Sequence, residues 1–229
     1  STPSNSSAAS DVYKRQLWIR GRGEASSMRK KRYREFLRNG IRILSGSRPL
    51  ALLTISYFPV ALALPSFTIT WAPYMEQLGA DRWLLGLTGS IFVAVMGMGG
   101  YLGGRLAAGL GYKNTTMLSL TMVSSTYLML TLIVNPYMFI AASIPLEMGL
   151  GILSPTISAW MNEYIPSSER ATVVSLRRTL TLPFSVLGIS VMGVLSDLGS
   201  PRLAYVFSFI AIMMAMLSYS RTTKGDDIR

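Results

Sequence analysis

The sequence contains neither cysteine nor histidine among its 229 residues. Without cysteine the chain can form neither a disulfide framework nor a thiolate metal site. Histidine is the commonest base near neutral pH and a frequent metal ligand, so its absence makes hydrolytic and zinc chemistry difficult to build. We therefore expect no enzymatic activity, no metal site and no cofactor.

Charge is also scarce. Only 14% of the residues are charged and 50% are hydrophobic, whereas soluble domains have roughly 25% charged residues. The net charge of +11 arises mostly near the start, because twelve of the 22 bases precede residue 50. The composition therefore argues against a water-soluble fold.

The basic leader, residues 1–49, divides into two parts. Residues 1–27 are rich in Ser, Gly and Arg without apolar periodicity, which predicts disorder or a non-native segment. Residues 28–44 place apolar side chains at helical spacing among bases, which predicts an amphipathic helix on the membrane surface. A nucleic-acid-binding arm is the alternative, but this segment runs directly into an apolar stretch, so we expect no nucleic-acid partner. The start at Ser1 rather than Met indicates a fragment.

Six apolar stretches follow, each about long enough to cross 30 Å of hydrocarbon as a helix. They predict an all-α, polytopic membrane protein with a six-helix domain over residues 50–221 and a tail over 222–229. The predicted spans are Leu50–Trp71, Trp83–Arg105, Thr115–Val134, Tyr137–Met161, Thr172–Ser196 and Leu203–Ser220.

The distribution of bases predicts the orientation in the membrane. If the leader lies inside, only Arg82 and Arg202 fall in the outer loops, and the other bases lie on the inner side. Bases concentrate in cytoplasmic loops of membrane proteins, so both termini are expected in the cytoplasm of a cell-membrane protein.

A polar face on the fourth span is the strongest candidate site. Ser143, Glu147, Gly151, Ser154 and Ser158 recur at steps of three or four residues, which places them on one side of a helix. Glu147 lies about 15 Å from the outer end, close to the midplane. It could bind a proton or the substrate in a central cavity, or it could be a neutral acid hydrogen-bonded to a neighbouring helix. The expense of an intramembrane acid favours the first interpretation.

Residues of the first and fifth spans could line the same cavity. Tyr57 belongs to a polar face of the first span, and Thr181 and Ser185 to one of the fifth. Arg177 and Arg178 lie about a turn and a half inside the fifth span, where snorkelling to the inner headgroups is the simpler interpretation. A cytoplasmic gate, or a counter-ion for an anionic substrate, is the alternative.

The second span carries a stripe of glycines. They are close to one face of the predicted helix, which indicates close helix packing and is also compatible with sliding between helices. The stripe consists of Gly86, Gly89, Gly97, Gly100 and Gly104.

The segment after the second span resembles a family motif. Residues 104–113, Gly-Arg-Leu-Ala-Ala-Gly-Leu-Gly-Tyr-Lys, are similar to the major facilitator superfamily loop Gly-x-Leu-Ala-Asp-Arg-x-Gly-Arg-Lys. Ala108 and Gly109 replace the Asp and Arg, so the charge interaction of the motif is absent. Residues 164–172 resemble the loop before the eleventh helix of bacterial members, and the leader resembles the central loop. The resemblance marks these residues as a cytoplasmic gate or loop motif, together with the two arginines of the fifth span: Gly104, Arg105, Gly111, Lys113, Glu169, Arg170, Arg177 and Arg178.

The resemblance implies the carboxyl-terminal six-helix half of a twelve-helix carrier. Its first, second, fourth and fifth spans would line the cavity, and its third and sixth would face lipid. Its partners would be the lipid bilayer, an N-terminal six-helix half absent from this chain and a small-molecule substrate. The two halves would rock about a central site. We expect a secondary transporter coupled to a proton gradient; a non-transporting receptor, assembly factor or inert relative with the same fold is the alternative.

Overall fold

The computed structural model describes residues 38, 40–198 and 200–221. Its contacts divide the chain after Ile43, and the unit beginning at Leu44 is described here. Part of the predicted surface helix, residues 40–44, is helical. Residues 28–37 and 39 of that helix, the leader 1–27 and the tail 222–229 lie outside the described residues.

The described part of the chain is helical and contains no strand, so the all-α prediction is confirmed. A helix occurs at each of the six predicted spans, and the first span is divided in two. The helices are α3 (Arg48–Ser56), α4 (Phe58–Gln77), α5 (Arg82–Leu110), α6 (Tyr112–Leu130), α7 (Pro136–Tyr164), α8 (Arg170–Leu198) and α9 (Pro201–Ser220).

Among the described residues, five segments are long and apolar enough to cross a membrane: the joined α3 and α4, and then α5, α7, α8 and α9. The helix at the third predicted span, α6, is not among them, because its 19 residues include several hydroxyl side chains and begin with polar residues. Some of these hydroxyls bond to carbonyls four residues earlier, as Thr115 does to Gly111, the residue before α6, and Thr121 to Met117. Such bonds satisfy the hydroxyl groups without a partner from another helix.

The first span breaks at Tyr57. Tyr57 ends α3 and precedes α4, and its N–H donates to Thr54 O at 3.2 Å. The break follows from Pro59, the second residue of α4, because proline has no N–H to continue the helical ladder. Tyr57 therefore occupies the joint between two helices rather than the middle of one.

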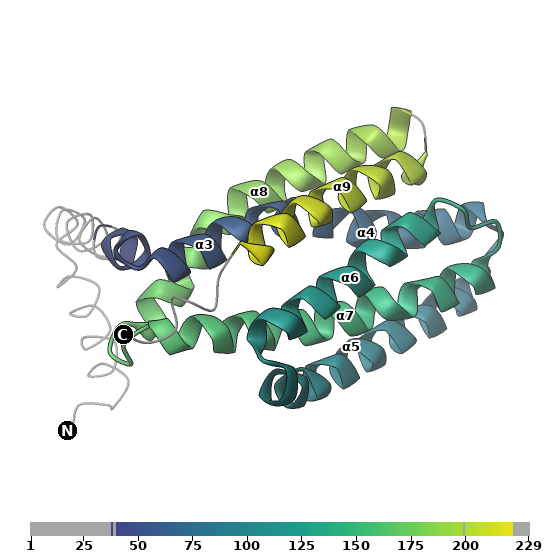
Figure 1. Ribbon diagram of the computed structural model, residues 1–229. Coiled ribbons are helices and arrows are strands. Elements are labelled where there is room, and N and C mark those ends of the chain that lie inside the picture. Colours follow the sequence, from purple (N-terminus) through teal and green to yellow (C-terminus); the bar gives the residue numbers. More distant parts are fainter. Residues whose placement is uncertain (1–37, 39, 199, 222–229) are drawn as a thin grey trace, which may run out of the picture. The chain divides into compact units, whose positions relative to one another are not determined.

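The helices form two groups. In Figure 1, α7 lies with α5 and α6, while α4 lies with α8 and α9, and α6 and α9 join the groups. The contacts repeat when α4, α5 and α6 are exchanged for α7, α8 and α9. Such an internal repeat is typical of secondary transporters. It places α4 and α7 in equivalent positions at the centre of the two groups.

Glycines bring α5 and α7 into backbone contact. A Cβ at Gly151 would clash with Met96 O, and one at Gly103 would lie 3.1 Å from Ile152 O. The predicted glycine stripe only partly overlaps this packing face: a Cβ at Gly100 would lie 3.9 Å from Gly151 O, whereas one at Gly86, Gly97 or Gly104 would meet nothing within 4 Å. The closest contact with α7 is made by Gly99 and Gly103, on the adjacent face of α5.

Candidate functional site

Glu147 is the buried carboxylate of α7. Its side chain is only 9% exposed, and it lies about 17 Å along the helix from Pro136. No described residue forms a hydrogen bond or an ion pair with it. A buried acid without a partner is unfavourable when ionised, so this position requires water, a cation or a proton.

The rest of the α7 polar face does not form one continuous surface. Ser143 is fully buried and donates to Phe139 O of its own helix at 2.8 Å. Gly151 is packed against the backbone of α5, which leaves no space for a Cβ. Ser154 and Ser158 are exposed, and Ser158 donates to Ser154 O at 2.8 Å. Burial therefore differs along the predicted polar face: Ser143, Glu147 and Gly151 lie inside the bundle, whereas Ser154 and Ser158 are exposed.

Two predicted residues from different spans come together at the joint of the first span. The Arg177 guanidinium carbon of α8 lies 4.4 Å from the centre of the Tyr57 ring. Arg177 is half-buried, and its Nε is buried without a hydrogen-bond partner. Tyr219 of α9 interacts electrostatically with both residues. The arginine and tyrosine thus form a cation–π pair with an unused donor.

The other predicted residues of the fifth span do not join Glu147. Thr181 is buried and donates to Arg178 O at 3.1 Å, one turn back in the same helix. Ser185 is half-buried, and Arg178 is exposed. No contact described for these three residues reaches Glu147. The structure therefore separates the predicted site residues into a carboxylate on α7 and an arginine cluster on α8.

The loop motif forms the turn between α5 and α6. Gly111 has a positive φ of 79° and its N–H donates to Ala107 O at 2.9 Å, which ends α5. Such a backbone favours glycine. Lys113 donates to Ser220 O, the last residue of α9, at 2.7 Å. The turn thereby holds the end of α9, as a basic residue near a helix C-terminus does.

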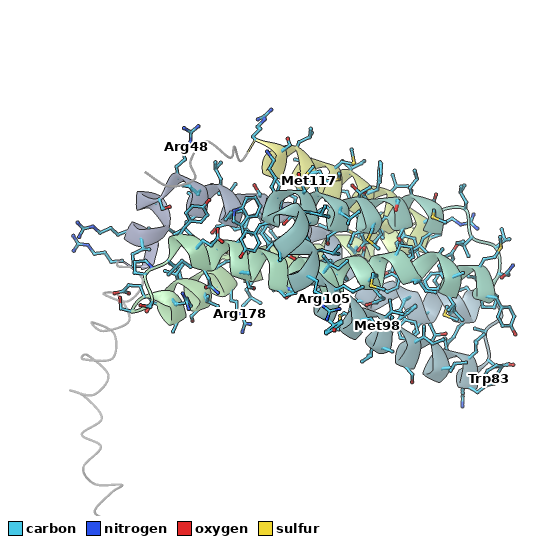
Figure 2. All side chains as sticks on the ribbon, turned by 60° about the horizontal axis from the view of Figure 1, so that its bottom comes forward. Arg48, Trp83, Met98, Arg105, Met117 and Arg178 are labelled. Carbon is cyan, nitrogen blue, oxygen red and sulfur yellow. The ribbon has the colours of Figure 1, made fainter. Side chains whose placement is uncertain are left out.

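The remaining motif residues lie on the surface. Gly104 and Arg105 are exposed, and the Arg105 guanidinium lies 4.6 Å from the Tyr101 ring centre; Figure 2 shows Arg105 on α5, the helix that begins beside Trp83. Glu169 precedes α8, where its carbonyl accepts from Val173 N, and Arg170 is the first residue of the helix. These residues border the helix ends rather than the interior.

Sequence reasoning missed a group of hydrogen bonds around Arg202 at the opposite end of the bundle, called the Arg202 clasp below. Arg202 of α9 donates through Nε to Tyr74 Oη at 3.1 Å and through Nη2 to Ile133 O at 3.2 Å. Tyr74 Oη donates to the same carbonyl at 3.3 Å. Arg202 and Lys113 are each the second residue of their helix, and each binds a carbonyl at the end of the other's helix. The sequence signal that could have indicated these contacts is the equivalent position of the two bases, each near the start of a helix.

A buried hydroxyl network on α4 was also missed. Ser208 bonds to Ser66 Oγ at 2.7 Å, Thr70 donates to Tyr205 Oη at 2.9 Å, and Tyr127 donates to Ala63 O at 3.2 Å. Pro65 lies within this stretch of α4, where it removes one backbone hydrogen bond. The network therefore links α4 to α6 and α9 around the proline.

Comparison with known proteins identifies the family. The family model described as Major Facilitator Superfamily matches residues 50–227. That range extends from α3 to the end of α9 and beyond. The family that the loop motif suggested is therefore confirmed, and the match covers most of the chain. No curated protein matches the sequence. Since members of this superfamily are membrane transporters, the chain is a membrane protein with transporter architecture, and it belongs to the Major Facilitator Superfamily.

Proposed function

We propose that the protein is a secondary active transporter that moves a small solute by alternating access and is coupled to protons through Glu147. The observation that carries the proposal is the burial of this carboxylate in the middle of α7, with no hydrogen-bond or ion-pair partner among the described residues. Membrane-embedded acids of this kind mark proton relays and substrate pathways.

The physical basis is the different environment that each protonation state needs. A protonated carboxyl is neutral and tolerates burial, whereas a carboxylate requires water or a cation. If the transporter opens alternately to the two sides, Glu147 would take a proton from one side and release it to the other.

The proposal includes the orientation and the partners. The protein would lie in the cell membrane with both termini in the cytoplasm, and a second six-helix half would complete the pathway. In keeping with this, α5 and α8 expose large apolar side chains, including Val93 at 68% and Leu182 at 61%. These surfaces would contact lipid and the second half.

The test compares two glutamates of one helix. The full-length protein that the gene encodes would be reconstituted into vesicles loaded with a pH-sensitive dye, and candidate solutes would be added outside. Glu147→Gln should abolish solute-dependent proton entry, because glutamine cannot exchange a proton. Glu163→Gln, at the exposed end of α7, should retain it. Proton entry that Glu147→Gln leaves unchanged would remove the coupling role from Glu147.

A further inference from the structure

We infer that Arg177 and the Tyr57 ring form a binding site for an oxyanion, a carboxylate or phosphate group, between α8 and the joint of α3 and α4. The inference rests on the proposed transport function and adds a substrate class to it. Its starting point is the distance of 4.4 Å between the Arg177 guanidinium carbon and the Tyr57 ring centre.

The contact with the ring does not satisfy the hydrogen-bond donors of the guanidinium. A cation over an aromatic ring is attracted by the charge distribution of the ring, which offers no oxygen acceptor at its face. The structure shows the consequence at Nε, which is buried without an acceptor. A buried charged donor without an acceptor is costly, so the site calls for an oxygen ligand.

Neighbouring side chains do not supply that oxygen. Phe58 and Phe184 stack on each other at 4.2 Å between α4 and α8. The hydroxyl of Tyr219 already donates to Leu53 O at 3.4 Å. No described carboxylate forms an ion pair with Arg177. Among the described residues, Arg177 therefore has an aromatic contact and no ion-pair partner.

The adjacent arginine argues against snorkelling as the whole explanation. Arg178 is exposed, and Figure 2 shows it pointing away from the bundle. Arg177 lies about 100° around the helix from Arg178, on the packed side of α8 that also carries Gly188, where a Cβ would clash with the backbone of Leu62 on α4. A side chain that only needed to reach headgroups would follow Arg178 outward. Arg177 instead turns toward α4.

Carboxylate and phosphate oxygens fit these donors best. Either group can accept two parallel N–H bonds from one guanidinium, which gives charge compensation and a fixed orientation. The same chemistry is present in a soluble organic anion, in inorganic phosphate and in a phospholipid headgroup. The experiment therefore has one arm for soluble anions and one for lipid.

The first arm uses the full-length protein in dodecyl maltoside as wild type, Arg177→Gln and Arg178→Gln. Melting temperature is followed against succinate, benzoate and inorganic phosphate, with chloride keeping the ionic strength constant. At least one anion should stabilise the wild type and Arg178→Gln saturably. In Arg177→Gln its apparent affinity should fall about tenfold or more, as expected for loss of a charged donor. If Arg177→Gln does not fold, Arg177→Lys gives the same test, because lysine keeps the charge without the planar donors.

The second arm adds phosphatidylglycerol to the micelles in place of soluble anions. Stabilisation that depends on Arg177 only in this arm would identify a lipid phosphate as the ligand. Equal responses in Arg177→Gln and Arg178→Gln, or no response to any anion or lipid, would overturn the inference. The outcome is separate from that of the Glu147→Gln test, because anion-dependent stabilisation is an equilibrium measurement in detergent that requires no proton entry.

Discussion

The two central helices, α4 and α7, occupy equivalent positions and treat their buried polar groups differently. On α4, Ser66 and Thr70 bond to hydroxyls of α9, and Ala63 O accepts from Tyr127 of α6. On α7, Glu147 has no hydrogen-bond or ion-pair partner among the described residues. Partnered polar groups hold helices together. The polar residues of α4 thus join helices, whereas the carboxylate of α7 is left available for the coupling role that we propose.

The largest expected effect concerns how α7 is held. Gly151→Ala should lower the stability of the protein by at least about 2 kcal/mol, because the added Cβ would clash with Met96 O across the contact with α5. The control Gly97→Ala, on α5 but with nothing within 4 Å of its Cβ position, should change stability by less than about 1 kcal/mol. Thermal unfolding in detergent measures both. Equal melting temperatures for the two variants would contradict the tight contact between α5 and α7.

A second prediction tests the end of α4. Arg202→Gln should destabilise by about 1.5–3 kcal/mol, since it removes charged hydrogen bonds to Tyr74 and Ile133. Arg82→Gln removes an exposed base at the start of α5 and should have little effect. Urea denaturation or thermal melting separates these outcomes. Equal stability of the two variants would show that the Arg202 clasp contributes nothing to holding α4.

The smallest expected effect concerns the hydrogen bond from Tyr127 to α4, and it tests whether Tyr127 has a structural role. Tyr127→Phe removes the hydroxyl that donates to Ala63 O and should cost about 0.6–1.5 kcal/mol. Tyr101→Phe, at an exposed position, serves as the control. Proton-coupled uptake should persist in Tyr127→Phe. Loss of coupling without loss of stability would move Tyr127 from the α4 network to the machinery of Glu147.

The helices were predictable because burial in lipid requires long apolar runs, and those runs are visible in the sequence. The burial of Glu147 was predictable for the same reason, since an acid within such an apolar run must lie inside the bundle or the membrane. Side-chain contacts between distant segments were not: Tyr57 and Arg177 meet although 120 positions separate them. Periodicity also could not identify which face of α5 contacts α7, because glycines occur on both sides of that helix. Both the Tyr57–Arg177 contact and the packing face of α5 depend on how the helices pack against one another, which no local sequence pattern specifies.

The central claim is that Glu147 becomes accessible to water during the transport cycle that we propose, whereas the α4 network does not. Because the chain has no cysteine, Glu147→Cys and Ser66→Cys can be introduced singly and treated with a charged, membrane-impermeant thiol reagent in reconstituted vesicles. The account predicts modification at position 147 and none at position 66, where the serine is fully buried. An unreactive cysteine at 147, or faster reaction at 66, would contradict it.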